Sequence, residues 1–246
     1  MKNKLVFLDT ETTGNDLEKD RLCQVAFKQN GKTEVKNFKP TLPISVKAMS
    51  VTHITNKMVE KEKAFKDSAF SKKLQKILAE NIMVAHNAKF DIAMLESEGI
   101  KIGKYICTLR LARYLDDDES IPEYNLQFLR YYYGVEIEAV PHTAEGDVAV
   151  LEAVFEYIYE LAKEKAPQAS EEEIINRMID ISANPVAIKK FTFGKYNGEM
   201  VEAIFRKDKG YLEWLYKTKK EEGTDEDWLF TLEKYLGEEK NENKLI

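Results

Sequence analysis

Short apolar runs separated by polar turns open the chain, in a pattern typical of β-strands. The unbroken apolar run Leu5-Val6-Phe7-Leu8 predicts a first strand over residues 4–11. Two further extended runs, at 22–27 and 33–38, predict two more strands. Asn30-Gly31 lies between these two runs, and this dipeptide is a strong hairpin signal. The N-terminal region is therefore expected to begin a sheet with an antiparallel edge.

Helical periodicity dominates the following residues. Residues 51–55, which follow two prolines, are expected to lie in a loop. The fully apolar run 82–85 predicts a buried central strand, and 105–108 predicts another strand. Apolar spacing predicts a helix over 68–80 and helical segments between the strand at 105–108 and Tyr133. Two further helices are predicted to start at N-caps, one from Asn87 to Glu98 and one from Thr143 to about Lys165. Leading strands followed by alternating helices predict an α/β fold with mixed strand directions.

The polar segment at 166–170 is the clearest boundary in the chain. Beyond it we expect a helix to about Ile181, and then a strand that meets an Asn-Gly turn within 191–198. Two amphipathic helices are predicted next, around 211–215 and from about Asp225 to Leu236, with frayed residues after them. The sequence thus divides into a main domain at 1–165, a linker with a connecting helix at 166–186, and a small α+β domain at 187–246.

Composition narrows the class of protein. The chain has 246 residues, of which 43% are hydrophobic and 33% charged, as in ordinary globular proteins. We find no run of about 18 apolar residues and no signal peptide, so we expect a cytoplasmic protein that does not bind membranes. The net charge of −6 argues against a broad basic surface for nucleic acid, but not against an enzyme that holds a chain end through metal ions. Cys23 and Cys107 are too far apart in sequence for a redox motif and are expected in the core.

Two acids directly follow the apolar run of the first strand. Side chains two residues apart on a strand project to the same face, so Asp9 and Glu11 should stand side by side. Burying two carboxylates without a counter-charge would cost several kcal/mol. A divalent cation removes that cost, and hard oxygen ligands suit Mg²⁺ or Mn²⁺. The alternative to a metal site is that Asp9 and Glu11 are two solvated acids at the end of a strand.

Three more candidates occur where strands end and helices begin. Asp91 lies in the first turn of the helix that Asn87 is expected to cap, where an acid could instead serve only the helix dipole. His142 precedes Asp147 by five residues, and an N-cap at Thr143 would place the histidine outside the helix that carries the acid. A surface loop histidine is the alternative for His142. Four acids and one histidine together suit a two-metal phosphodiesterase, with neutral His142 taking a proton from the attacking water.

The motifs Asp-Thr-Glu-Thr-Thr-Gly at 9–14, His-Asn-Ala-Lys-Phe-Asp at 86–91 and His-x4-Asp at 142–147 resemble those of the DEDDh (DnaQ-like) 3′→5′ exonuclease family. The segments 48–55 and 105–113 also fit this family. Segments 191–198 and 209–215 resemble the C-terminal region of its exonuclease X-type branch, so the resemblance covers about residues 4–236. It implies an RNase H-like mixed central sheet flanked by helices.

The resemblance also implies an activity and a set of site residues. It implies 3′→5′ degradation of DNA, single-stranded and at duplex ends, to nucleoside 5′-monophosphates with two Mg²⁺ ions, for which Mn²⁺ could substitute. By this resemblance Asp9, Glu11, Asp91 and Asp147 bind metal and His142 is the general base. Thr10, Thr12, Asn87 and His53 are expected near the substrate, although His53 could instead pin its own loop.

The sequence leaves several alternatives open. An exoribonuclease would use the same acids, so RNA remains an alternative substrate, and a proofreading partner of a polymerase is a further one. A non-catalytic nucleic-acid-binding module is disfavoured because all five chemical groups are present. A homodimer stays open. In the C-terminal domain, Lys189, Lys190, Lys195 and Tyr196 could bind nucleic acid. The alternative is that the lysines only serve solubility and that a small core is formed by Phe191, Phe193, Tyr211 and Trp214.

Overall fold

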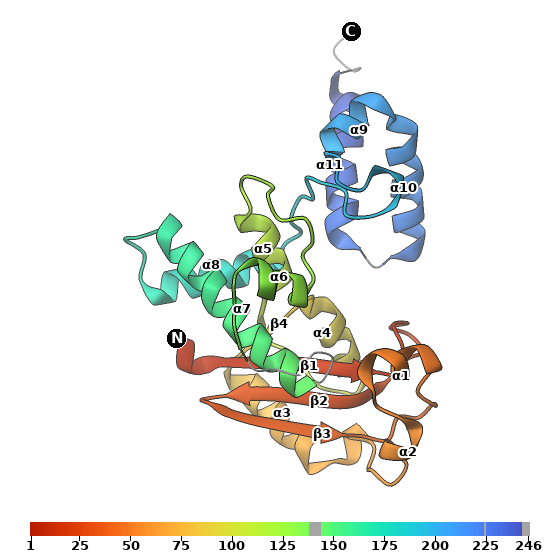
Figure 1. The fold of residues 1–246 in the computed structure, drawn as a ribbon, viewed down its shortest axis with the longest axis vertical. Helices are drawn as coiled ribbons and strands as arrows, with labels where there is room; N and C mark the ends of the chain where they lie inside the picture. The colour runs from red at the N-terminus through yellow and green to blue at the C-terminus, as the bar shows by residue number, and fades with distance from the viewer. Residues whose placement is uncertain (138–143, 224, 243–246) are drawn as a thin grey trace. The chain divides into compact units, whose positions relative to one another are not determined.

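The computed structural model of the chain describes residues 1–137, 144–223 and 225–242, and side chains as far as Gly237 (Figure 1). It contains two compact units. Unit 1 comprises Met1–Leu111 and Asn125–Ala183, and unit 2 comprises Ala112–Tyr124 and Asn184–Ile246. Each unit is therefore described by itself.

A mixed sheet forms the centre of unit 1. Within the described residues its five strands have the order β3-β2-β1-β4-β5. Their bounds are β1 Leu5–Thr12, β2 Leu22–Gln29, β3 Lys32–Asn37, β4 Ile82–Ala85 and β5 Lys104–Cys107. Strands β1, β2 and β3 pair antiparallel, whereas β4 runs parallel to both β1 and β5. These strands confirm the mixed α/β sheet that the apolar runs predicted.

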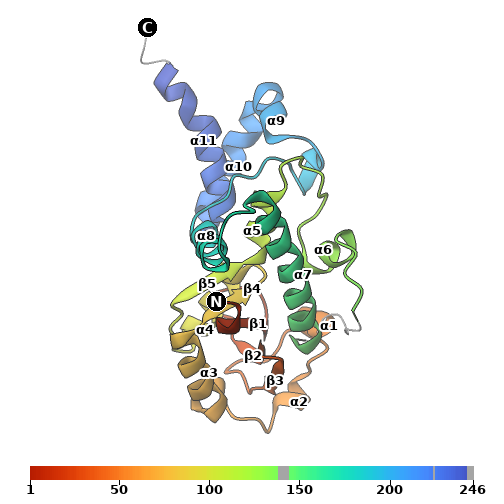
Figure 2. The ribbon, with the colours of Figure 1, turned by 90° about the vertical axis from the view of Figure 1, so that its left-hand side faces the viewer.

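Helices cover both faces of this sheet. The helices of unit 1 are α1 Val46–Thr52, α2 Asn56–Val59, α3 Ala69–Glu80, α4 Ala88–Ser97, α6 Leu126–Tyr132, α7 Ala144–Lys165 and α8 Glu171–Ala183. Figure 2 shows α7 on one side of the sheet and α3 and α4 on the other. The α3 and α4 side holds a core cluster that includes Val6, Leu8, Leu74 and Met94, whereas Phe7 packs on Phe155 of α7 with ring centroids 5.4 Å apart. Alternate residues of β1 thus face different helices, as a strand requires.

Helix α8 is bound to the sheet through one buried serine. The Ser182 hydroxyl accepts from the backbone N–H of Cys107 at 2.8 Å and donates to the carbonyl of Met178 at 2.7 Å. The carbonyl of Ser182 accepts from the Tyr105 hydroxyl and from Arg110. This segment was predicted as a connecting helix, and in the structure it packs on β5 as part of unit 1.

Unit 2 is helical within its described residues. Helix α5, Thr108–Leu115, contains the boundary between the units, and α9 Val201–Lys207, α10 Lys209–Glu222 and α11 Glu226–Glu242 follow later in the chain. Their core cluster includes Phe191, Leu212, Trp228 and Leu232. The frayed end expected after Leu236 is instead helical up to Glu242.

One local prediction is only partly right, and another is wrong. Of the loop expected at 51–55, residues 53–55 are irregular, whereas Val51 and Thr52 end helix α1, whose N-cap Ser45 accepts from the Ala48 N–H. Thr55 is the N-cap of α2. The strand expected at 191–198 does not form; a 3₁₀ turn occupies Gly194–Tyr196, and one isolated bridge joins Lys190 to Met200. The two glycines at 194 and 198 have φ of 66° and 85°, which curl the segment instead of extending it.

Candidate active site

Strand β1 delivers two acids to the face covered by α7. Asp9 and Glu11 follow Phe7 at two-residue intervals, so they share its face, and both are half-buried. The pairing of β1 with β2 shifts register between Glu11 and Thr12. Such an irregularity re-aims neighbouring side chains and is common beside functional sites. The pair predicted from the sequence is therefore present on one face.

Helix α7 brings the third acid to this pair. Asp147 lies in its first described turn, and one carboxylate oxygen from each of Asp9, Glu11 and Asp147 lies within 4.8 Å of the other two. The side-chain amide of Gln127 on α6 donates to Asp147 Oδ1 at 2.8 Å. Residues from three separate parts of unit 1 thus converge at the end of β1.

The fourth acid approaches from the opposite face of β1. Asp91, in the first turn of α4, is only 4% exposed and accepts from the Thr10 hydroxyl at 2.7 Å. Its charge still acts on Asp9 and Glu11. Thr10, expected near the substrate, is itself buried and orients Asp91. The strand pleat explains this, because Thr10 projects away from its two acidic neighbours.

Burial raises the pKa values of Asp9, Glu11 and Asp91, and nearby carboxylates raise those of Asp9 and Glu11 further. Burial, and then the carboxylates of Asp91, Glu11 and Asp147, raise the pKa of Asp9 well above its usual value. Burial, and then Asp147 and Asp91, raise the pKa of Glu11 to about 8. Burial raises the pKa of Asp91 to about 7, although the hydrogen bond from Thr10 opposes the shift. The site therefore resists carrying its full negative charge near neutral pH.

This arrangement fits divalent cations. All four side chains are carboxylates, which are the hard ligands that Mg²⁺ and Mn²⁺ prefer. A cation between them would offset both the desolvation and the mutual repulsion that raise these pKa values. The donor set therefore agrees with the metal site predicted from the sequence.

The raised pKa values predict a pH-dependent stability. A carboxyl with a higher pKa in the folded chain contributes stability that is complete below its unfolded pKa, about 4, and is lost as pH rises through its folded pKa. For Asp91 and Glu11 that loss extends to about pH 7 and about pH 8. We expect the Tm in chelator to fall by about 5 °C or more from pH 5 to pH 9, and Mg²⁺ to restore more of it at pH 9 than at pH 5.

Thermal melts with EDTA or Mg²⁺ across this pH range test the expectation. Glu11→Gln removes one of the titrating groups and should flatten the curve recorded in EDTA. A Tm in EDTA that rises between pH 6 and pH 8 would contradict the assigned repulsion.

The remaining residues predicted for the site are Thr12, His53, Asn87 and His142. Thr12 is buried, and its hydroxyl donates to the carbonyl of Gly14 at 2.6 Å. Asn87 and His53 are exposed and adopt the left-handed conformation, with φ of 59° in both, and the Asn87 side chain makes no capping bond. His142 and the predicted N-cap Thr143 lie outside the described residues. The role of His142 stays a prediction.

Gln127 is a contact that sequence reasoning did not find. A glutamine in an amphipathic helix carries no signal of its own, and only the fold places it beside Asp147. Its carbonyl oxygen accepts from Arg130 Nη1 at 3.5 Å, so the side chain is held at both ends. Gln127 therefore orients Asp147.

We expect Gln127→Leu to weaken binding of Mg²⁺ to the acidic cluster by about tenfold, because loss of a group that orients a metal ligand typically weakens metal binding by that factor or more. Calorimetric titration with Mg²⁺ measures the dissociation constant. Gln75→Leu is a matched control, since Gln75 bonds to the backbone of Lys101. Equal dissociation constants for the Gln127 variant and the unchanged chain would show that this bond does not orient Asp147.

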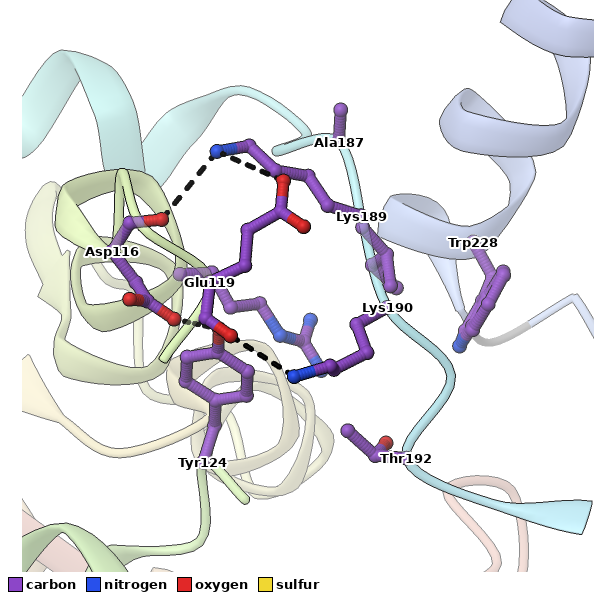
Figure 3. Close-up of a pocket in the computed structure, with 10 residues that line it drawn as sticks. Asp116, Glu119, Tyr124, Ala187, Lys189, Lys190, Thr192 and Trp228 are labelled. Carbon is purple, nitrogen blue, oxygen red and sulfur yellow. Dashed lines mark hydrogen bonds and ion pairs between the residues drawn. The ribbon is translucent and has the colours of Figure 1, made fainter. Parts of the chain in front are cut away.

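A cavity in unit 2 is lined by Arg113, Tyr124, Thr192 and Trp228, among others, with Lys189 and Lys190 across it (Figure 3). Its volume is about 20 Å³, room for one water molecule. Lys189 Nζ lies 3.4 Å from the carbonyl oxygen of Asp116, and Lys190 Nζ donates to the carbonyl of Glu119 at 3.0 Å. These two lysines therefore connect segments of unit 2, and the cavity is too small for a nucleotide.

The mixed sheet and the acids gathered at the end of β1 define a class of nucleases with an RNase H-like fold. A family model described as Exonuclease matches residues 6–155, and the chain belongs to this family. A second model, described as Exodeoxyribonuclease X-like C-terminal, matches residues 191–220.

Individual relatives indicate which members of the exonuclease family this chain is similar to. The chain is 30% identical over 182 residues to Exodeoxyribonuclease 10 of Escherichia coli strain K12, covering 72% of this chain and 74% of that protein. Exonuclease X in complex with 5′ overhanging duplex DNA is similar in structure, with TM-score 0.56, 26% identity, and coverage of 72% of this chain and 99% of that one. A zinc-bound complex of E. coli ExoI with single-stranded DNA shares the fold at TM-score 0.55 and 19% identity, over 72% of this chain and 43% of that one.

Hydropathy adds one negative finding. Among the residues that the structure describes, no helix combines the length and apolar character that crossing a bilayer would require.

Proposed function

We propose that this chain is a divalent-metal-dependent 3′→5′ exodeoxyribonuclease that releases nucleoside 5′-monophosphates. The observation that carries the proposal is the convergence of Asp9, Glu11 and Asp147 within 4.8 Å, with buried Asp91 acting on the same group. Membership of the exonuclease family supports the reaction class. The names of its relatives, Exodeoxyribonuclease 10 and Exonuclease X in complex with 5′ overhanging duplex DNA, support DNA as substrate. We propose that the chain acts on single-stranded DNA and at duplex ends.

Metal ions are part of this proposal. We assign Asp9, Glu11, Asp91 and Asp147 as ligands for two Mg²⁺ ions, which Mn²⁺ could replace. When bound, such ions would lower the pKa of a water molecule and stabilise the departing 3′ oxygen. The protein contributes the fixed carboxylates, with Thr10 orienting Asp91 and Gln127 orienting Asp147.

His142 is assigned as the general base. It precedes Asp147 by five residues, and its neutral imidazole would take the proton of the attacking water. Thr12, His53 and Asn87 are proposed to contact the terminal nucleotide. His53 and Asn87 are exposed and therefore accessible to a substrate, whereas buried Thr12 would contribute through the turn that it holds.

We propose that the catalytic site belongs to residues 1–165, that 166–186 connect it to the rest, and that 187–246 form an exonuclease X-type C-terminal domain. The match at 191–220 supports the last assignment. The segment Ala112–Tyr124 packs with this C-terminal domain, and helix α8 packs with unit 1.

One experiment tests the function. Purified protein is incubated with Mg²⁺ and 5′-end-labelled single-stranded DNA, duplex DNA with either overhang, or RNA of matched sequence. We expect stepwise shortening from the 3′ end of DNA, release of 5′-monophosphates, and reversible loss of activity in EDTA. Faster digestion of RNA than of DNA would replace the proposal with an exoribonuclease, and metal-independent cleavage would overturn it.

A further inference from the structure

Basic residues and exposed aromatic rings are frequent in one segment of unit 2. Residues 189–220 contain nine lysines and arginines against four acids. Acids outside this segment pair with two of these lysines, Glu119 with Lys189 and Glu222 with Lys219. The same segment carries two exposed rings, Trp214 at 56% and Phe193 at 37%.

Backbone hydrogen bonds make the loop at 190–200 rigid. The Phe191 N–H donates to the carbonyl of Glu199 at 2.9 Å, and the Gly198 N–H donates back to the carbonyl of Phe191 at 2.7 Å. A Cβ added at Gly194 would lie 3.1 Å from the Tyr211 hydroxyl, so this ring packs directly against the loop backbone. The loop therefore holds Phe193 in a fixed position.

Asp208 connects this loop to helix α10. Its side chain caps α10 by accepting from the Tyr211 N–H, and it also accepts from the Tyr196 hydroxyl at 2.5 Å and from Lys195 Nζ at 3.0 Å. The Lys195 ammonium lies 4.6 Å and 5.0 Å from the ring centroids of Tyr196 and Tyr211. Lys195 is thus held beside the rings while its side chain remains 58% exposed.

Ring contacts connect the two exposed aromatic side chains through the core. Phe193 contacts Phe191 at 6.0 Å, Phe191 contacts Tyr211 at 5.8 Å, and Tyr211 contacts Trp214 at 5.4 Å between centroids. The buried rings, including Trp228 at 3% exposure, account for the core of unit 2. That core does not require Trp214 to be a large ring, since most of its surface faces solvent.

A second cation lies beside Tyr196, the ring that Lys195 also contacts. Lys207 Nζ is 5.4 Å from the centroid of the Tyr196 ring and forms an exposed pair with Glu199 at 3.3 Å. Exposed pairs contribute little to stability, so a phosphate can replace this partner at small cost. Lys195, Lys207, Tyr211 and Trp214 are here called the aromatic–lysine surface.

We propose that the aromatic–lysine surface binds single-stranded nucleic acid, with a base stacked on Trp214 and phosphates beside Lys195 and Lys207. Unpaired bases expose the faces that aromatic rings stack on, whereas the bases of a duplex already stack on one another. The side chains of Lys195 and Lys207 are 58% and 62% exposed, so their ammonium groups can pair with phosphates. This surface lies within unit 2 and is distinct from the acidic site, so the proposal does not rest on the catalytic one.

Intrinsic fluorescence gives a direct test on the full chain. The protein contains two tryptophans, and Trp228 is buried, so changes caused by added ligand report mainly on Trp214. In EDTA, which prevents hydrolysis, we expect oligo(dT) to quench this emission to saturation and added salt to reverse the quenching. Absence of quenching, or quenching by poly-glutamate in place of oligo(dT), would overturn the proposal, the latter in favour of an acidic protein partner.

Matched variants identify the residues. Trp214→Ala should weaken binding of fluorescein-labelled oligo(dT), measured by anisotropy, by about tenfold. Phe230→Ala removes a comparably exposed ring from α11 and should change affinity less than twofold. Lys207 is exposed, so Lys207→Gln should not disturb the core of unit 2. This variant should reduce the slope of log affinity against log salt concentration by about 0.7. Equal losses in the Phe230 and Trp214 variants would overturn the proposal.

The outcomes separate this proposal from the catalytic one. Hydrolysis in Mg²⁺ without quenching in EDTA would overturn nucleic-acid binding by the aromatic–lysine surface and support the nuclease assignment. Quenching in EDTA without hydrolysis in Mg²⁺ would support binding by this surface and overturn the nuclease assignment.

Discussion

Asp9→Asn is expected to abolish hydrolysis and to stabilise the metal-free protein. Activity should fall by at least about 10³-fold, because the variant loses charge on a residue assigned to bind metal and several kcal/mol of transition-state stabilisation with it. In EDTA at pH 8 the Tm should rise by about 5 °C, since folding of the unchanged chain at this pH must either bury the Asp9 charge among other carboxylates or protonate it, and asparagine requires neither. Initial rates and thermal melts of the same preparation measure both effects.

The Asp9→Asn variant is informative because its activity is expected to fall while its Tm rises. Glu96→Gln removes an exposed acid on α4, away from the cluster, and should leave rate and Tm nearly unchanged. A lower Tm for Asp9→Asn in EDTA would mean that Asp9 serves the fold. Retained hydrolysis would remove it from the proposed ligands.

His142→Ala is expected to lower the maximal rate by about 10²- to 10⁴-fold, the range typical of a lost general base. In the unchanged chain at Mg²⁺ concentrations that keep the proposed ligands saturated over this range, the rate should rise through about pH 6 to 8 as the imidazole loses its proton. The variant should lose this rise. Rate–pH profiles of both proteins measure the effect.

The chain's other two histidines complete the test. His53→Ala and His86→Ala should both keep the rise with pH; His86 Nδ1 lies 2.9 Å from the Thr108 hydroxyl oxygen, as expected of a structural histidine. If either variant loses the rise while His142→Ala keeps it, the base has been assigned to the wrong residue.

Strong local patterns predicted most of unit 1. The apolar run before Asp9 and the Asn30-Gly31 turn determine where strands lie and how they pair, because each is a short-range signal. The approach of Asp91 to Asp9 was also predictable: β4 runs parallel to β1, and α4 starts at the same edge of the sheet. Alternation along the strand placed Asp9 and Glu11 together.

The missed features depend on contacts between distant residues. Helix α1 has one buried residue, Thr52, so apolar spacing could not reveal it. The Phe191-Thr192-Phe193 alternation resembled a strand, but Phe191 packs on Trp228 and Tyr211, and the glycines turn the backbone. Gln127 and Thr10 acquired their roles only when the fold placed a carboxylate beside each.

Unit 2 is assembled from two stretches of chain that are not contiguous, and this determines how it can be separated from the nuclease. Its first stretch is Ala112–Tyr124, where Arg113 binds Asp227 at 2.7 Å and Asp116 accepts from Tyr124. Ending the chain at Ala183 would leave Arg113 without Asp227 and Asp116 without Lys189. No single stop codon therefore yields an intact nuclease free of unit 2, and a fair dissection of the two activities has to use point substitutions.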